Sequence, residues 1–292
     1  MILYQQIESN KRKSIFIVLA FVSFILLLGG LLSYAQTGDW LSGAITAAVI
    51  AVIYVAFVLF QSTRMLMRLN GAQRIESRDH HPFLWHTVEG LALAARIPMP
   101  QVYIISDPSP NAFAAGLKPE SATVAVTSGL LDRLNREEVE AVVAHEIAHI
   151  RNYDVRLATI AIALVAVVAI ISDFGMRMFF FGKRRNNNNL HPAILVIALI
   201  FVILSPLVAT FIQLALSRNR EFLADSDGAA LNRNPEALAR ALEKISTHPE
   251  PVESAKASSA ALYIADPLKK KVSRLFATHP PVEERVARLR KM

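Results

Sequence analysis

Residues 145–149 read His-Glu-Ile-Ala-His, the pattern H-E-x-x-H, within a stretch of helical spacing. Residues four apart lie on one face of a helix, so His145 and His149 can bind one metal ion. Glu146 can accept a proton from water that the metal activates, without binding the metal itself. The alternative is a helix whose histidines are only solvated or hydrogen-bonded. The amphipathic helix around the motif favours the zinc site.

The helix that carries this motif is expected to begin near Asn135. Asparagine is a favourable N-cap residue, and Glu138, three positions further on, completes the pattern of a capping box. Glu137, Glu138 and Glu140 place negative charge in the first turns, where the helix dipole favours it. These local signals predict a capped helix that runs through His149.

A catalytic zinc ion needs a third protein ligand, and the chain contains no cysteine. The ligand must therefore be histidine, glutamate or aspartate. Glu221 and Asp225 lie four apart on a predicted helix, so one can bind the metal while the other receives the free N–H of a metal-bound histidine. The alternative is a solvated helix end of mixed charge, and spacing alone favours this plainer interpretation.

The chain is apolar for a soluble protein, with 53% hydrophobic residues and a mean hydropathy of +0.36. Two uncharged runs, at about 15–34 and 40–60, are long enough to cross about 30 Å of hydrocarbon. A signal peptide is the alternative for the first run. Its length and the second run directly after it favour a transmembrane hairpin within residues 1–64. Basic residues flank both outer ends and are absent from the turn, which predicts cytoplasmic outer flanks.

Residues 156–216 contain two further apolar runs, at about 157–181 and 192–216. If both runs cross the membrane, their connector lies outside the cytoplasm although residues 183–185 are basic, which the positive-inside rule disfavours. The alternative is a helical hairpin that packs on the soluble domain or enters one leaflet, and hydropathy favours spanning. Either arrangement returns the chain to the side that it left, so the motif and Glu221 can meet at one membrane face.

Residues 65–155 and 217–292 are expected to form a cytoplasmic domain. The first part combines a helix with three short strands that form a small antiparallel sheet, and the second part is mostly helical. The predicted helix covers 82–96, and the strands cover 101–106, 111–115 and 122–127. The predicted fold class is a mainly α membrane protein, with transmembrane helices and a zincin-like metalloprotease domain that contains this sheet.

Over nearly its whole length the chain resembles the HtpX family of membrane zinc endopeptidases, relatives of the prenyl-protein (CAAX) proteases. The resemblance rests on both apolar hairpins, the HEIAH helix and the segments Asn111–Ala114, Glu221–Asp225 and Thr278–Pro281. It implies that Glu221 is the third zinc ligand and that Asp225 orients a metal-bound histidine without binding the metal. It also implies that His279 stabilises the oxyanion.

By the same resemblance, the segment beside the substrate cleft consists of Asn111, Ala112, Phe113 and Ala114. A strand edge near Asn111 is expected to be exposed and to bind an extended chain by strand addition. Thr247-His248-Pro249 repeats the tripeptide at Thr278. Only the later copy precedes Pro281-Val282-Glu283-Glu284-Arg285, which favours His279 over His248.

The expected function is a membrane-bound endopeptidase with one zinc ion per subunit, which degrades misfolded or damaged membrane proteins under stress. It is expected in the plasma (inner) membrane as a multi-pass protein, with its active site facing the cytoplasm. Its partners are unfolded polypeptides and the lipid bilayer. The net charge of +7 lies mainly at the ends of apolar runs, so no nucleic-acid partner is expected.

Two alternatives remain at this stage. One is a CAAX-type prenyl-protein protease, for which four apolar segments are few. The other is a non-catalytic membrane scaffold, against which the intact His145, Glu146 and His149 argue.

Overall fold

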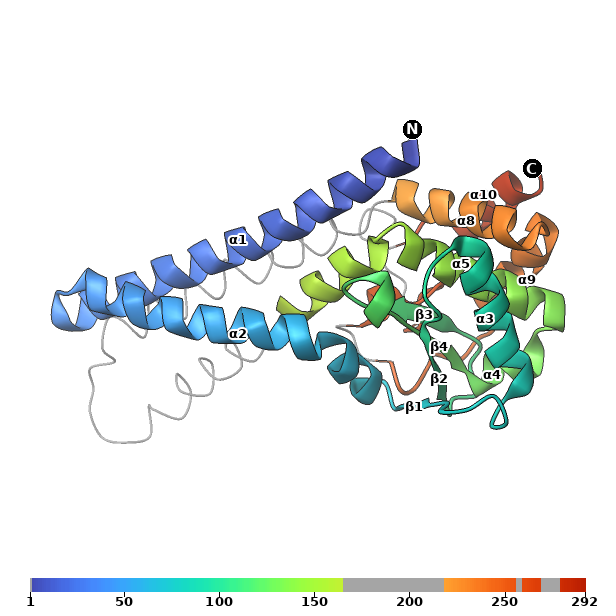
Figure 1. The fold of residues 1–292 in the computed structure, drawn as a ribbon, viewed down its shortest axis with the longest axis horizontal. Helices are drawn as coiled ribbons and strands as arrows, with labels where there is room; N and C mark the ends of the chain where they lie inside the picture. The colour runs from blue at the N-terminus through green and yellow to red at the C-terminus, as the bar shows by residue number, and fades with distance from the viewer. Residues whose placement is uncertain (1, 165–217, 256–258, 269–278) are drawn as a thin grey trace. The chain divides into compact units, whose positions relative to one another are not determined.

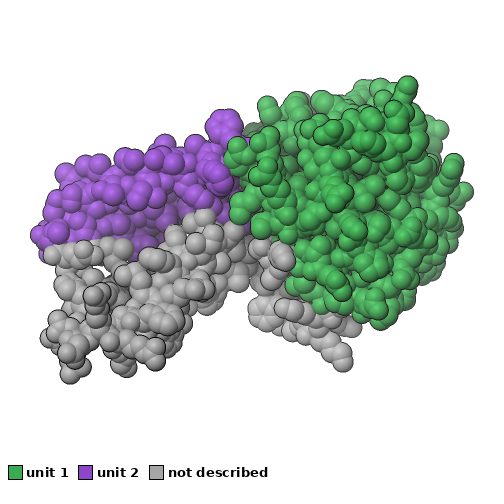
Figure 2. Space-filling view, turned by 90° about the horizontal axis from the view of Figure 1, so that it is seen from below, with its two compact units in different colours: residues 1–11, 61–159, 215–292 green, residues 12–60, 160–214 purple. Residues whose placement is uncertain are grey.

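The computed structural model describes residues 2–164, 218–255, 259–268 and 279–292. Most of the second predicted hairpin, residues 156–216, lies outside the described residues. The chain divides into two compact units (Figure 2). One unit contains residues 1–11, 61–159 and 215–292, and the other contains residues 12–60 and 160–214.

Two long helices, α1 (Ile2–Thr37) and α2 (Trp40–Leu69), supply most of residues 12–60 of the second unit, and their outer ends belong to the first unit. Their segments Ile7–Leu31 and Trp40–Leu69 are long and apolar enough to cross a membrane. Large apolar side chains on both helices are exposed, as on Phe60 at 84%. Extended exposed apolar surface on a helix is what a lipid-facing segment requires.

The sheet of the first unit has the strand order β1-β2-β4-β3 among the described residues. Its strands are β1 (Ala72–Arg74), β2 (Gln101–Ile105), β3 (Ala112–Ala115) and β4 (Thr123–Thr127). The β1–β2 and β3–β4 pairs are antiparallel, but β2 and β4 are parallel. The sheet is therefore mixed, and the prediction of a wholly antiparallel sheet is wrong. The reason is that β4 turns back from β3 into the place beside β2 and so runs in the direction of β2.

Helices make up most of the other regular structure of the first unit among the described residues (Figure 1). The longer ones are α3 (Pro82–Ala95), α5 (Arg136–Arg151), α8 (Arg218–Asn232), α9 (Pro235–Thr247) and α10 (Val282–Leu289). The shorter ones are α4 (Ser128–Arg133), η1 (Pro119–Ser121) and η2 (Ala260–Leu262). Helix α5 packs against α3, β3, β4, α8 and α9, so the H-E-x-x-H motif lies in the core of this unit.

The start of α5 confirms the predicted capping box. Asn135 Oδ1 accepts the backbone N–H of Glu138 at 2.9 Å, and Glu138 Oε2 accepts the N–H of Asn135 at 2.9 Å. Glu138 is buried, and Lys244 Nζ of α9 donates to its Oε2 at 2.7 Å. The cap therefore fixes the start of α5 and also joins it to α9.

Helix α8 approaches α5 closely because Gly228 lacks a side chain. A Cβ atom at this position would lie 2.9 Å from both the Cα and the N atom of His145, and 3.2 Å from the carbonyl carbon of Ala144. Atoms at such distances overlap, so any side chain here separates the two helices. The separation between α5 and α8 sets the distance from Glu221 to the two histidines.

Gly228→Ala is expected to destabilise the protein by about 1–3 kcal/mol, because the added methyl group overlaps the backbone of α5. Gly90→Ala on α3 is the matched control, since no atom lies within 4 Å of a Cβ at that position. Thermal unfolding in detergent compares the two variants. A Gly228→Ala melting temperature equal to that of Gly90→Ala would show that the close approach does not constrain the fold.

Candidate metal centre

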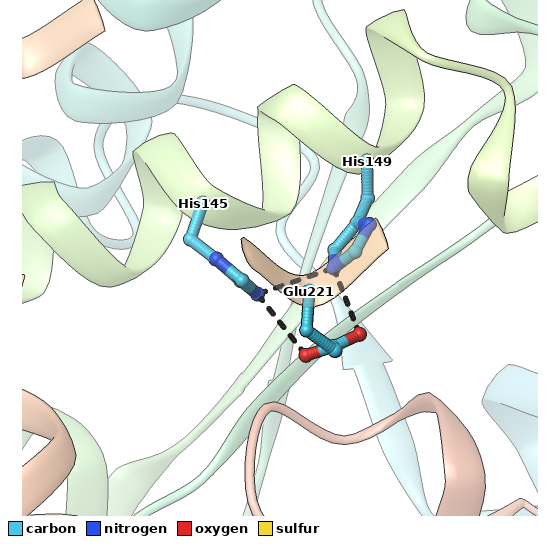
Figure 3. A group of neighbouring side chains, drawn as sticks. All are labelled: His145, His149 and Glu221. Carbon is cyan, nitrogen blue, oxygen red and sulfur yellow. Dashed lines mark hydrogen bonds and ion pairs between the residues drawn. The ribbon is translucent and has the colours of Figure 1, made fainter. Parts of the chain in front are cut away.

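Three side chains converge from two helices, His145 and His149 from α5 and Glu221 from α8 (Figure 3). The two Nε2 atoms lie 3.1 Å apart. Glu221 Oε1 lies 3.5 Å from His149 Nε2, and Glu221 Oε2 lies 3.9 Å from His145 Nε2. The structure thus brings together the three residues that the sequence and the resemblance predicted as ligands.

The distances between these donor atoms suit one small cation. Ligands arranged tetrahedrally at about 2.0–2.1 Å from zinc are about 3.4 Å from one another, close to the separations observed. Two imidazoles and one carboxylate are also a donor set that zinc takes in catalytic sites, with the fourth position left open. The cluster therefore fits a metal ion.

The second ring nitrogen of each histidine faces a carboxylate. His145 Nδ1 lies 3.0 Å from Asp225 Oδ1, and His149 Nδ1 lies 3.0 Å from Asp154 Oδ2. In metal sites a carboxylate at this position accepts the Nδ1 proton and orients the ring, so that Nε2 can bind the metal. The structure places Asp225 beside His145, as expected. Asp154 was not predicted, although its position just beyond α5, five residues after His149, is a usable signal.

Arg285 of α10 is a second residue that the sequence analysis missed. It is buried, and its Nε and Nη2 atoms donate to the two oxygens of Asp225 at 2.9 and 2.7 Å. Its Nη1 donates to the backbone carbonyl of Ile264 at 2.9 Å and lies 3.7 Å from Glu221 Oε2. Arg285 therefore holds Asp225 in place behind His145. An arginine on the otherwise apolar face of a short helix was the available signal.

The surroundings of His149 favour its positively charged form, whereas those of His145 disfavour a charge on that ring. Burial lowers the pKa of His145 to about 4, against the hydrogen bond to Asp225. Burial also opposes charge on His149, but the hydrogen bond to Asp154 and the charge of Glu221 outweigh it and raise the pKa of His149 to about 9. Glu221 is buried too, yet nearby His279 and His149 hold its pKa well below the ordinary value. The carboxylates of Asp154 and Glu221, which favour the charged form of His149, would also favour a cation beside this ring.

Glu146 lies in a pocket beside this cluster. Burial raises the pKa of its carboxyl group to about 7, against the favourable charge of His149. Its Oε1 atom is buried and has no hydrogen-bond partner within the described part of the chain. The pocket is lined by Ala114, Glu146, His149, Asp154, Val155, Ala158, Arg220, Glu221, Ala261 and Leu262. Glu146 thus offers a free carboxylate oxygen inside a pocket that also contains two of the candidate ligands.

The two predicted histidine–proline positions differ in the structure. His279 Nδ1 lies 3.1 Å from Glu221 Oε2, so His279 belongs to the cluster. His248 lies at the end of α9, where its Nε2 atom is 4.0 Å from Glu250 Oε2. His279, which the segment Pro281–Arg285 favoured over His248, is therefore the histidine at the candidate centre.

The expectation of an exposed strand edge near Asn111 is wrong. Asn111 and all of β3 are buried, and the chain itself covers this part of the edge. Ile264 N donates to Ala112 O at 2.9 Å, Phe113 pairs with Tyr263, and Asn111 Nδ2 donates to Ala265 O at 3.1 Å. The backbone groups of a strand edge need partners, and residues 263–265 supply them. Ala114 alone of the predicted four lines the pocket.

A buried glutamate between two histidines one helical turn apart, with a carboxylate from a second helix, defines the H-E-x-x-H class of metallopeptidases. The model of Peptidase family M48 matches residues 81–292. The chain belongs to this family, and within it to the HtpX proteases.

Relatives match the whole chain. A protein named Protease HtpX homolog from Listeria monocytogenes serotype 4b (strain CLIP80459) is 50% identical over 99% of this chain and 100% of its own length. A protein of the same name from Leuconostoc citreum (strain KM20) is 45% identical with the same coverage. The crystal structure of S. mikatae Ste24p covers 98% of this chain and 67% of that chain, with a TM-score of 0.52 and 18% identity. That likeness shows a shared fold.

The Asp225–Arg285 pair predicts an acid-dependent loss of stability. Burial opposes charge on Asp225, but Arg285 and His145 outweigh it and lower its pKa from 3.8 to about 2. The stabilisation is therefore fully present above about pH 4 and is lost as the pH falls through about 2, an effect of about 2 kcal/mol. The free energy of unfolding of the wild type should fall more between pH 5 and pH 2 than that of Asp225→Asn. Equal losses in both proteins would contradict the assigned pair.

Proposed function

We propose that this chain is a membrane-bound, zinc-dependent endopeptidase in which His145, His149 and Glu221 hold one zinc ion. The observation that carries the proposal is the convergence of these three side chains from two helices beside the buried carboxylate of Glu146. Membership of Peptidase family M48 and the relatives named Protease HtpX homolog support it.

In this proposal Glu146 is the general base. A bound zinc ion would acidify a water molecule and polarise the carbonyl group of the scissile peptide. Glu146 Oε1 accepts the proton of the attacking water and later donates it to the leaving amine. Burial raises the pKa of this carboxyl group above its ordinary value, which favours acceptance of a proton.

The other residues of the centre orient these groups. Asp225 and Asp154 hold the rings of His145 and His149 by their Nδ1 atoms. His279, beside Glu221, is proposed to donate a hydrogen bond to the carbonyl oxygen of the substrate as negative charge develops on it. Ala114 is proposed to contact the substrate backbone at the edge of the pocket.

The proposed substrates are extended polypeptides, which include misfolded or damaged membrane proteins. Glu146 is buried inside its pocket, so a scissile peptide has to enter the pocket as an extended segment, which a folded substrate does not offer. In the proposed topology, residues 1–64 and 156–216 form membrane hairpins, and residues 65–155 and 217–292 form the protease domain on the cytoplasmic side of the inner membrane. The basic flanks of the first hairpin support this orientation.

Glu146→Gln is expected to abolish casein cleavage while zinc binding stays within about threefold of wild type, because Glu146 serves as a base and not as a ligand. His149→Ala should lose both properties. Zinc affinity is measured by competition with a chromophoric chelator, and cleavage is measured on the same detergent-purified samples. Cleavage by Glu146→Gln at the wild-type rate would overturn the assigned base.

Unfolded substrates should be preferred over folded ones. We expect denatured casein to be cut at many sites, whereas a stable folded protein of similar size is spared until it is unfolded. Mass spectrometry of the cleavage products tests this preference. Cleavage of a farnesylated peptide is measured separately, as the assay for prenyl-protein processing. Cleavage of a folded protein at one site, with casein spared, would contradict the proposed substrate class.

A further inference from the structure

The first eleven residues of the chain belong to the compact unit that contains the candidate metal centre. Within them, Asn10 of α1 is buried, with only 3% of its surface exposed. Its Nδ2 group donates to Asp154 Oδ1 at 2.7 Å and to the backbone carbonyl of Asn152 at 3.1 Å. Both N–H bonds of this amide are therefore directed at the turn that follows α5.

Asp154 connects Asn10 to a proposed zinc ligand. One oxygen of its carboxylate accepts from Asn10, and the other lies 3.0 Å from His149 Nδ1. The Nε2 atom on the far side of the same ring faces His145 and Glu221. A continuous line of contacts thus runs from the N-terminal helix through a carboxylate and an imidazole to the metal position.

A second contact secures the same turn. Lys11 Nζ lies over the ring of Tyr153, 4.6 Å from its centroid, and Tyr153 adopts a left-handed backbone conformation with φ of 60°. This conformation is costly for a residue with a large side chain and needs support from its surroundings. Asn152, the residue before it, donates from Nδ2 to Asp227 Oδ2 of α8 at 2.8 Å. The turn is therefore held between the N-terminal segment and the helix that supplies Glu221.

We propose that Asn10 is a positioning residue of the metal centre, which fixes the carboxylate of Asp154 and through it the ring of His149. This inference rests on the proposed function, since it assigns His149 to a zinc ion. Loss of the amide leaves Asp154 Oδ1 without this donor and lets the carboxylate rotate away from His149. Groups that orient a metal-bound histidine typically contribute tenfold to a hundredfold to metal affinity.

The test measures zinc affinity by chelator competition on the full chain in detergent. The proteins compared are the wild type, Asn10→Ala, Asp154→Ala, the double variant, and Gln5→Ala as the matched amide control on an exposed part of the same helix. We expect zinc binding to weaken about tenfold in Asn10→Ala and to stay unchanged in Gln5→Ala. The double variant should bind no more weakly than Asp154→Ala, because both changes break the same line of contacts.

An exchange of the two residues separates positioning from folding. Asn10→Asp alone sets two carboxylates against each other and should weaken zinc binding further. Combining it with Asp154→Asn removes the repulsion between the two carboxylates, because the amide introduced at position 154 can donate to the carboxylate introduced at position 10, and its oxygen can accept from His149, although the bond to the carbonyl of Asn152 stays lost. We expect the exchange variant to bind zinc at least about tenfold more tightly than Asn10→Asp.

Several results would overturn the inference. The first is a wild-type zinc affinity in Asn10→Ala, with only the melting temperature lowered. The second is a loss of zinc affinity in the double variant that equals the sum of the two single losses. The third is an exchange variant that binds zinc no more tightly than Asn10→Asp. A wild type that binds no zinc would instead overturn the proposed function, and this inference with it.

Discussion

The close packing of α8 on α5 is the constraint on which the centre depends. Helix α5 presents His145 and His149 on one face, but two imidazoles do not complete a catalytic zinc site. Glu221 reaches them because Gly228 of α8 has no Cβ atom. The backbone of α8 can therefore pack directly against the backbone of α5 at His145. The core around Val142, Val143 and Ile147 holds α5 in place, so the fold and the ligand geometry have a common origin.

The same packing buries an unusual number of charged groups. Glu146, Glu221, Asp225 and Arg285 are all removed from water within a few ångströms of the two histidines. Burying a charge is unfavourable unless it is paired, and Arg285 balances only part of the negative charge. The hydrogen bond to Asp154 and the charges of Glu221, Asp154 and Glu146 outweigh burial and raise the pKa of His149. The buried charged groups thus lower the stability of the fold, and the unpaired negative charge among them favours a cation.

Local signals in the sequence predicted the parts of this architecture that depend on local chemistry. Asn135 and Glu138 marked the start of α5, and the four-residue spacing of His145 and His149 placed both rings on one face. The pairing of β2 with β4 was missed, because parallel pairing is decided by how a hairpin folds back and not by strand periodicity. The buried edge at Asn111 was missed because the covering residues, 263–265, are distant in sequence.

The candidate ligands also divide into those that local sequence predicts and those that it does not. Spacing alone did not favour Glu221 over a solvated charge, and only the resemblance to the HtpX family selected it. No motif assigns a role at the centre to Asp154, Arg285 or Asn10, and the packing of separate helices brings them there. The candidate metal ligands are thus easier to predict from the sequence than the residues that contact those ligands.

His145 and His149 of α5 and Glu221 of α8 are proposed to bind a single zinc ion. Anomalous scattering at the zinc absorption edge, on crystals of the zinc-loaded protein, tests it most directly. The account predicts one strong peak per chain, at about 2.0–2.2 Å from His145 Nε2, His149 Nε2 and a Glu221 carboxylate oxygen. A peak bound by other residues, or one that leaves Glu221 outside the coordination sphere, would contradict it.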